Sequence, residues 1–268
     1  MTKEKTNEKV VVIGGTGLIG SKVVQDLNEK GFDAVAAAPN TGVNTLTGEG
    51  LAEALEGASV VVDVSNSPSF EEKAVMDFFT SSTGNLLKYE QEAGVKHHVA
   101  LSVVGTERLT DSPYMRAKVA QEKLIKESPI PYTIIHATQF FEFIKGIADA
   151  ATDGDTARIP AASIQPMAAD DVAAEVSAIA TSDPENGTIE IGGPEVFRIE
   201  DIVQKRLKAQ DDTRNVVSDP KATYFGALLS DKELLPGPGA RLSTTRFDEW
   251  LRTTTFPPND ASRAAKSG

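Results

Sequence analysis

Apolar and polar positions along the chain follow two different periods. Short apolar runs over residues 10–13, 34–38, 60–64, 98–104 and 132–136 predict strands that are buried on both faces. Residues 19–30, 50–55, 70–93 and 113–127 lie between most of these runs and have the spacing of helices. Strands and helices that alternate in this way form a parallel sheet with helices on either side. The first half of the chain therefore predicts an α/β fold built on a doubly wound parallel sheet.

Three glycines follow the first predicted strand at regular spacing. In the stretch VVIGGTGLIG, Gly14, Gly17 and Gly20 occupy the turn into the next helix. Gly14 permits the sharp turn, Gly17 lets a pyrophosphate approach the backbone, and Gly20 lets helix and strand pack closely. Unpaired N–H groups at the start of the helix would hold the phosphates. We therefore predict a dinucleotide cofactor here, with contacts from Gly14, Thr16, Gly17, Leu18, Ile19 and Gly20.

The end of the second predicted strand bears on which dinucleotide binds. A carboxylate that holds the ribose 2′-hydroxyl of NAD(H) is expected there, but the chain has Ala38, Pro39 and Asn40, which we take as cofactor contacts. Nothing at this position repels a 2′-phosphate. No arginine is present to grip one, and Asn40, Thr41 and Lys22 are the available donors. The sequence therefore favours NADP(H) over NAD(H).

A tyrosine and a lysine lie four residues apart near the start of the helix predicted over 113–127. Ser112 is the expected N-cap and Pro113 the first helical residue, so Tyr114 and Lys118 share one helix face. A phenol has a pKa of about 10 in water, and a nearby ammonium lowers it towards the range useful for proton transfer. Ser102 lies near the end of the preceding strand. A merely structural Tyr/Lys pair is the alternative interpretation.

The stretch GGTGLIG, Ser102 and the Tyr114-x-x-x-Lys118 pair together resemble the short-chain dehydrogenase/reductases. The glycine spacing, the chain length and the stretch ATQFFEF at 137–143 are similar to the atypical, NmrA-like branch. The resemblance covers nearly the whole chain, including QPMAADDVA at 165–173 and GGPEVF at 192–197. It implies a Rossmann-type sheet, with 9–138 as the NAD(P)-binding core and 139–256 as a small substrate-binding region that returns a strand at about 188–192. Residues 1–8 and 257–268 are expected to be tails.

The same resemblance implies a role for each candidate site residue. Tyr114 would donate or accept the proton, Ser102 would hold the substrate carbonyl, and Lys118 would bind the nicotinamide ribose and tune Tyr114. Further cofactor contacts are implied for Val64, Ser65, Asn66, Ala137, Thr138 and Gln139, and substrate contacts for Val104, Phe140 and Phe141. The phenylalanines also fit core positions. His136 stands where such proteins often carry arginine, and we expect it to be a hydrogen-bonded structural residue.

Composition removes several classes of function. The net charge is −12 and the pI about 4.8, so bulk charge gives no affinity for nucleic acid or an anionic membrane. The absence of cysteine excludes disulfides, thiolate catalysis and zinc–thiolate sites. His97 and His98 are adjacent in a strand and point to opposite faces, so no metal is predicted. Neither a signal peptide nor an apolar run of about 20 residues is present, so we expect a cytoplasmic monomer or homodimer that acts on a small molecule.

These features predict an NADP(H)-dependent oxidoreductase that transfers hydride to or from a small carbonyl, alcohol or quinone-like substrate, with Tyr114 as general acid or base. One alternative is a non-catalytic NAD(P)-binding redox sensor of the NmrA type. A second is a nucleotide-sugar epimerase or dehydratase, which usually needs a larger substrate domain. The presence of Ser102, Tyr114 and Lys118 favours catalysis. The sequence leaves open the substrate, the reaction direction and whether these three residues are active.

Overall fold

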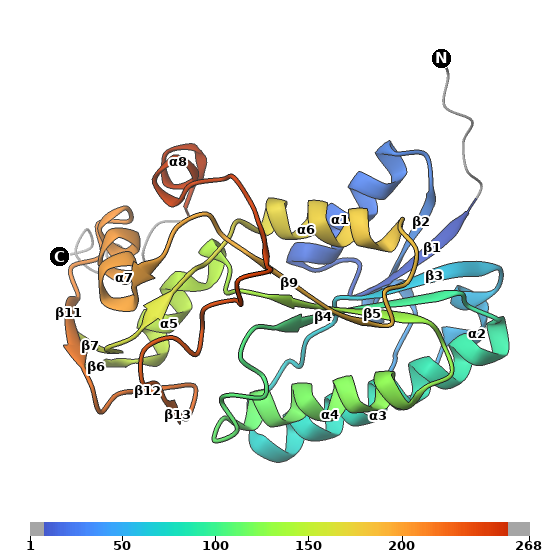
Figure 1. Cartoon of the computed structure of the whole chain (residues 1–268), viewed down its shortest axis with the longest axis horizontal. Coiled ribbons are helices and arrows are strands. Elements are labelled where there is room, and N and C mark those ends of the chain that lie inside the picture. The colour runs from blue at the N-terminus through green and yellow to red at the C-terminus, as the bar shows by residue number, and fades with distance from the viewer. Residues whose placement is uncertain (1–7, 257–268) are drawn as a thin grey trace, which may run out of the picture.

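The centre of the computed structural model, which describes residues 8–256, is a seven-stranded sheet (Figure 1). The strand order is β14-β9-β5-β4-β3-β1-β2, and every neighbouring pair is parallel. The strands are β1 (Lys9–Ile13), β2 (Asp33–Ala37), β3 (Ala58–Asp63), β4 (His97–Val103), β5 (Tyr132–Ala137), β9 (Gly187–Gly192) and β14 (Arg241–Leu242). Because β2 and β3 lie on opposite sides of β1, the sheet has a topological switch point between β1 and β3. The predicted α/β, Rossmann-type doubly wound sheet is confirmed.

Helices cover both faces of the sheet (Figure 1). One face carries α1 (Leu18–Glu29) and α6 (Ala169–Ala180), and the other carries α2 (Leu51–Leu55), α3 (Glu72–Ala93) and α4 (Pro113–Glu127). Val10 and Val12 of β1 join the hydrophobic cluster on the α1 side, whereas Val11 and Ile13 join the cluster on the α2–α3 side. Both faces of the strand are buried, which explains why β1 is apolar at consecutive positions.

The C-terminal part of the chain has a hydrophobic core of its own at one end of the main sheet (Figure 1). Its helices are α5 (Ile144–Ala150), α7 (Ile199–Lys208) and α8 (Phe247–Thr253). The remaining strands are β6 (Thr152–Asp153), β7 (Thr156–Pro160), β8 (Ser163–Ile164), β10 (Phe197–Arg198), β11 (Asn215–Asp219), β12 (Thr223–Tyr224) and β13 (Ala227–Leu228), and the 3₁₀ turns are η1 (Pro39–Thr41) and η2 (Phe141–Phe143). These short strands form three small sheets, β11-β7-β6, β10-β8 and β12-β13.

The predicted elements of the first half all lie within two residues of their expected bounds. In the second half, the strand expected at 188–191 is β9, which pairs with β5. Sequence reasoning missed the small strands and β14, because most are only two residues long and show no period. The expected tails lie outside the described residues, apart from Glu8.

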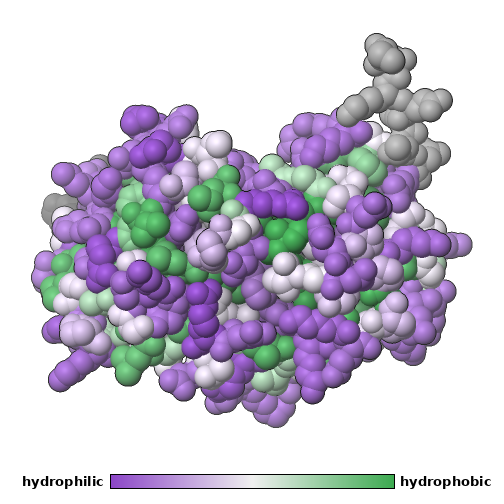
Figure 2. All heavy atoms as spheres, in the orientation of Figure 1, coloured by the Kyte–Doolittle hydropathy of each residue, from purple (hydrophilic) through white to green (hydrophobic). Residues whose placement is uncertain are grey.

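The surface is mostly polar on the face shown in Figure 2, where apolar side chains form small separate patches. Among residues 8–256, no helix combines the length and the apolar character needed to cross a bilayer.

Candidate cofactor and active site

The glycine turn between β1 and α1 is shaped by its own backbone. Gly14 has a φ of +76°, and its N–H donates to the Ala37 carbonyl of β2 at 2.9 Å. A Cβ on Gly20 would lie 2.2 Å from the carbonyl oxygen of Gly14, so α1 can approach β1 only if no side chain is present there. The turn and packing roles predicted for Gly14 and Gly20 are confirmed.

The same turn lies against the loop that follows β3. A Cβ on Gly14 would come within 3.0 Å of the Ser65 backbone, and the Val64 N–H donates to the Ile13 carbonyl at 3.0 Å. The carboxyl ends of β1 and β3 therefore meet at the switch point. Ligands of open α/β sheets bind in the crevice outside this point. Val64, Ser65 and the following Asn66 lie beside it.

The start of α1 is open to a phosphate group. Gly17 is the N-cap, and no side chain among the described residues caps this end of the helix. A Cβ on Gly17 would meet only the Gly14 carbonyl oxygen, at 3.2 Å. Thr16 and Leu18 are exposed, whereas the Ile19 side chain belongs to the core, so only its backbone could serve a cofactor. Uncapped N–H groups and the positive end of the helix dipole fit the pyrophosphate of a dinucleotide.

The end of β2 lies beside the glycine turn. The Thr16 hydroxyl donates to the side-chain oxygen of Asn40 at 3.0 Å, which places Asn40 against the turn. Ala38 is buried, and Pro39 and Asn40 are exposed. Of the other two predicted donors, Lys22 pairs with Asp170 at 2.5 Å and the Thr41 hydroxyl bonds the Ala38 backbone. Asn40 is therefore the donor best placed for the ribose end of a dinucleotide.

A cavity of about 440 Å³ adjoins this end of β2. It is lined by Val35, Ala36, Thr41, Gly42, Val43, Glu49, Gly50, Glu53 and Ala54. Glu49 and Glu53 bring negative charge to this part of the molecule. Position 38 carries no acid that would repel a 2′-phosphate, but the negative charges of Glu49 and Glu53 would oppose its binding nearby.

Lys118 is a buried cation with one donor hydrogen to spare. It is 2% exposed, and its Nζ donates to the Leu101 carbonyl of β4 at 2.9 Å and to Oε1 of Gln121. Burial lowers the pKa of Lys118 to about 8, against the opposing effect of two nearby carboxylates. An ammonium has three donor hydrogens, and the described residues take two of them. The third makes no hydrogen bond to the described residues.

Gln121 and Asp63 connect Lys118 to the loop at the switch point. Nε2 of Gln121 donates to Oδ2 of Asp63 at 3.1 Å. Oδ1 of Asp63 accepts from the Ser65 N–H at 3.0 Å and from the Ser65 hydroxyl at 2.6 Å. Asp63 and Gln121 are 2% and 1% exposed. A continuous buried chain of hydrogen bonds therefore runs from Lys118 on α4 to Ser65, which lies against Gly14.

Tyr114 lies one helical turn before Lys118, in aromatic surroundings. Its ring centroid is 5.6 Å from that of Phe70 and 5.9 Å from that of Phe79. Phe79 also lies beneath the Lys118 ammonium, with Nζ 4.5 Å from the ring centroid. Burial raises the pKa of Tyr114 to about 12. The prediction that Lys118 lowers the Tyr114 pKa is wrong for this structure, because burial of the phenol dominates.

Ser102 has a different partner from the one predicted. Its hydroxyl donates to Oε1 of Glu122 at 2.6 Å, and His136 Nε2 donates to the same oxygen at 2.9 Å. Burial would raise the pKa of Glu122, but the hydrogen bonds from His136 and Ser102 hold it below its usual value. Glu122 lies eight residues after Tyr114 on α4, about 12 Å along the helix axis.

Ser102 therefore ties β4 to α4 at a distance from Tyr114. The carbonyl-holding role expected of Ser102 has no support in this geometry, because its only proton is donated to Glu122. His136 is a hydrogen-bonded structural residue, as predicted.

Two of the three residues expected to contact substrate are inaccessible. Val104 and Phe141 are fully buried, and Phe141 packs in the C-terminal core with its ring centroid 5.0 Å from that of Phe247. For these two the prediction is wrong, because neither side chain is exposed and the C-terminal core encloses Phe141. Phe140 is partly buried and stacks on the exposed Phe143 at 5.5 Å between centroids, so it stays a candidate.

The segment after β5 carries buried polar groups without good partners. Ala137, Thr138 and Gln139 are buried, and the Thr138 N–H donates to the Ile191 carbonyl of β9 at 3.0 Å. The Gln139 amide lies beside the Tyr224 phenol, yet among residues 8–256 neither it nor the Thr138 hydroxyl makes a hydrogen bond of good geometry. Buried polar groups of this kind are rare in folded proteins. A ligand at the end of β5 would satisfy them, which agrees with the predicted placement of the nicotinamide.

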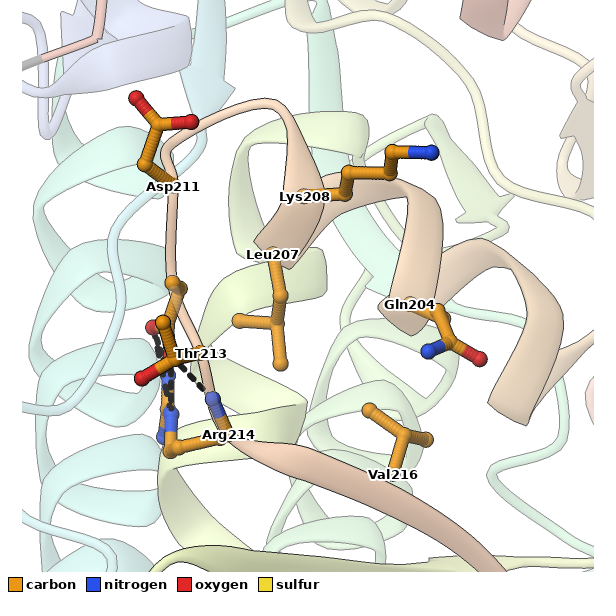
Figure 3. Close-up of a pocket in the computed structure, with 8 residues that line it drawn as sticks. Gln204, Leu207, Lys208, Asp211, Thr213, Arg214 and Val216 are labelled. Carbon is orange, nitrogen blue, oxygen red and sulfur yellow. Dashed lines mark hydrogen bonds and ion pairs between the residues drawn. The ribbon is translucent and has the colours of Figure 1, made fainter.

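A second cavity, of about 350 Å³, lies between α7 and β11 (Figure 3). It is lined by Gln204, Leu207, Lys208, Asp211, Asp212, Thr213, Arg214 and Val216. Arg214 is engaged by Asp212 and Asp149, each at 2.8 Å. None of the predicted site residues lines this cavity.

Sequence reasoning missed three buried polar residues of the site and the aromatic neighbours of Tyr114. Gln121 and Glu122 follow Lys118 at the spacing of one helical turn, and Asp63 interrupts an apolar strand. Both are usable signals, because a buried charge requires partners. Phe225, whose ring lies 6.1 Å from that of Phe70, comes from the distant β12–β13 turn and gives no local signal.

The fold and the site together define an α/β protein whose switch point fits a dinucleotide. Residues 14–183 match the model of a family described as NAD(P)H-binding. The match covers more than half of the chain, and the chain belongs to this family. It extends from Gly14 past the end of α6, so it includes the glycine turn, Lys118 and the end of β5.

Two curated relatives carry different names. The chain is similar to the Photosystem II assembly factor Ycf39 of Synechocystis sp., with 26% identity over 152 residues, which are 52% of this chain and 47% of the relative. It is also similar to the chloroplastic divinyl chlorophyllide a 8-vinyl-reductase of Cucumis sativus, with 25% identity over 228 residues, 72% of this chain and 54% of the relative. The chain spans about half the length of these relatives.

A solved structure shares the fold across nearly the whole chain. MoeE5 in complex with UDP-glucuronic acid and NAD superposes with a TM-score of 0.67 and 17% identity, covering 93% of this chain and 94% of that one. Identity at this level shows the architecture alone.

Proposed function

We propose that the chain is an NADP(H)-dependent oxidoreductase that reduces a carbonyl group of a small molecule, with Tyr114 as the proton donor. One observation carries the proposal: hydrogen bonds through Gln121 and Asp63 join Lys118, one helical turn beyond Tyr114, to Ser65, and the Ser65 backbone lies against Gly14 of the glycine turn. The cofactor end and the tyrosine end therefore belong to one site.

A bound NADPH would supply hydride for the carbonyl carbon of the substrate, and the chain's own residues would do the rest. A pKa of about 12 keeps Tyr114 protonated at neutral pH. The phenol can then give its proton to the carbonyl oxygen, which gains negative charge as the carbon is reduced. The remaining donor hydrogen of Lys118 would hold the ribose of the cofactor.

The preference for NADP(H) rests on the missing carboxylate at Ala38. It is opposed by Glu49 and Glu53, which line the cavity beside β2. We expect a 2′-phosphate to bind near Ala38, away from these two carboxylates. Asn40 lies against the glycine turn there and can donate to the phosphate.

A second candidate is a non-catalytic NAD(P)H-binding protein, either a redox sensor of the NmrA type or an assembly factor. The engagement of Ser102 by Glu122 favours it, because the substrate carbonyl loses the hydroxyl expected to hold it. Half of the chain is also similar to a protein named as an assembly factor. The remaining alternative is a nucleotide-sugar epimerase. Its only support is that the fold resembles a solved structure that contains a nucleotide sugar.

The test is a titration with NADPH and NADH, followed by an NADPH-consumption screen over aldehydes, ketones and quinones. The proposal expects tighter binding of NADPH and turnover of at least one carbonyl substrate. Tight cofactor binding without turnover of any of them would favour the non-catalytic candidate. Tighter binding of NADH would overturn the choice of cofactor.

A further inference from the structure

We infer that Gln121 and Asp63 are positioning residues for Lys118, forming a buried relay that joins its ammonium to the loop at the switch point. The inference rests on the proposed function only in assigning Lys118 to the cofactor. It concerns two residues that the sequence patterns did not single out.

The relay has one possible hydrogen-bond orientation. The Gln121 carbonyl oxygen faces the Lys118 ammonium, and its NH₂ group faces the Asp63 carboxylate. A flipped amide would place NH₂ against NH₃⁺ and C=O against COO⁻, so both ends fix the amide. The carboxylate is fixed in turn by the N–H and hydroxyl of Ser65.

Lys118 makes no direct ion pair with any of the described residues. Two carboxylates act on its charge, Asp63 from β3 and Glu122 from its own helix. Glu122 is already held by Ser102 and His136. The charge of Asp63 also acts on a further buried pair, Glu90 and His98. Asp63 is thus the carboxylate that reaches Lys118 through a bridge.

The bridge has two consequences. It holds the ammonium against the Leu101 carbonyl, and the Leu101 and Gln121 oxygens take two of its three donor hydrogens. It also makes the position of Lys118 depend on the Ser65 loop, which packs against Gly14. Binding of a dinucleotide at the switch point would therefore change the position of the Lys118 ammonium if it moves the Ser65 loop.

The test measures the titration of Lys118 directly, in the full chain without cofactor. Lysine labelled with ¹³C at Cε is followed by NMR, and the Lys118 resonance is assigned by its absence in Lys118→Arg. Asp63→Asn removes a charge that favours the ammonium, so we expect the Lys118 pKa to fall by about one pH unit from its starting value. Gln121→Glu places a carboxylate against both the ammonium and Asp63. Even where these two carboxylates share a proton, a negative charge then contacts the ammonium directly instead of through a bridge, so we expect a rise of similar size.

Thr133→Val is the matched control, because it removes a buried hydroxyl that bonds His97 at 2.9 Å and Glu185 N–H at 3.1 Å, away from the relay. It should lower the melting temperature and leave the Lys118 titration unchanged. If Asp63 and Gln121 only stabilise the fold, the Lys118 pKa should not shift in opposite directions in Asp63→Asn and Gln121→Glu. If Asp63→Asn does not fold, Gln121→Glu alone decides, and a Lys118 pKa equal to that of the control overturns the inference.

A second readout is the pH dependence of NADPH affinity. If the cationic form of Lys118 holds the cofactor, affinity falls as pH rises through its pKa. That fall should move to lower pH in Asp63→Asn and to higher pH in Gln121→Glu. Absence of carbonyl turnover would count against the proposed function and leave both of these results standing, so the two can fail separately.

Discussion

The glycine turn and the Tyr114–Lys118 region are two ends of one site, and they are built in different ways. The turn is a backbone structure: Gly14 bonds Ala37 through its own N–H, and Gly20 matters because a Cβ there would strike the Gly14 carbonyl. The tyrosine region is a side-chain structure, in which most of the contacts cross between elements. Lys118 reaches Leu101, and its partner Gln121 reaches Asp63, 58 residues earlier in the chain.

The difference shows what a motif can specify. A glycine at fixed spacing specifies a backbone path, because the missing Cβ acts on the nearest neighbours in the chain. A Tyr-x-x-x-Lys spacing specifies only that two side chains share a helix face. Their partners and pKa values depend on residues from α3, β3 and β4. The predictions that follow aim to separate these two kinds of structure.

The largest effect is expected at Tyr114. Tyr114→Phe removes only the phenolic oxygen, and loss of a general acid lowers kcat by about 10²–10⁴-fold. Ser102→Ala is the informative partner, because its hydroxyl is bound to Glu122. We expect that variant to lower stability by about 1 kcal/mol and to keep kcat within about threefold. Steady-state kinetics on a substrate from the screen, with the folded fraction measured, checks both; an intact kcat in Tyr114→Phe would remove the proposed mechanism.

The next effect concerns the turn. Gly17→Val places a branched side chain where phosphates should approach, and losing two hydrogen bonds to a charged group costs about 3 kcal/mol, or about 100-fold in NADPH affinity. Gly84→Val is the control, because a Cβ on that exposed α3 glycine meets no other atoms within 4 Å. Calorimetric titration measures affinity and circular dichroism the fold. Near-normal affinity in Gly17→Val would show that the turn is only structural.

A third prediction concerns the pH dependence of stability and uses His97, a buried residue outside both regions. Burial lowers the pKa of His97 to about 4, below its ordinary 6.5. Between these values the unfolded chain binds the proton and the folded chain does not, so stability is lost as pH falls from about 6.5 to about 4, by about 3 kcal/mol. His97→Asn should lack this part of the acid sensitivity. Urea unfolding at pH 7 and pH 4.5 measures it, and equal slopes with pH in both proteins would contradict the assignment.

The smallest effect is expected at Ala38, which follows β2 and bears on the choice between NADPH and NADH. Ala38→Asp brings a carboxylate to the end of β2, where repulsion of a nearby 2′-phosphate is worth at least about 1–2 kcal/mol because Ala38 is buried. NADPH affinity should fall about tenfold relative to NADH affinity. Parallel titrations with the two cofactors check this ratio. An unchanged ratio would mean that Glu49 and Glu53, rather than position 38, govern the choice.

Sequence reasoning succeeded where local rules decide. Consecutive apolar residues identified β1 to β5, because a parallel sheet buries both faces of each strand. The roles of Gly14 and Gly20 followed from the missing Cβ. The return of β9 to the sheet was also expected, from the family resemblance.

The rest depended on long-range packing. Phe141 could be core or substrate wall by sequence, and only the formation of the C-terminal core with Phe247 made it core. Ser102 could face Tyr114 or a residue further along α4, and its hydrogen bond to Glu122 decided the outcome. The pKa of Tyr114 depended on its burial against Phe70 and Phe79, which folding brings to it from elsewhere in the chain. Of these choices, only the one at Ser102 had a local signal, the position of Glu122 four residues after Lys118.

The central claim is that the glycine turn and Lys118 hold the same cofactor. The most direct test is NADPH titration of Lys118→Met beside Lys123→Met, a change on the same helix at a lysine that is 72% exposed. Loss of a charge-assisted hydrogen bond is worth about 1.5–3 kcal/mol, so Lys118→Met should bind NADPH at least about tenfold more weakly. Lys123→Met should bind it as the unchanged protein does. Equal affinity in both variants, with both folded, would contradict the claim that the two regions form one site.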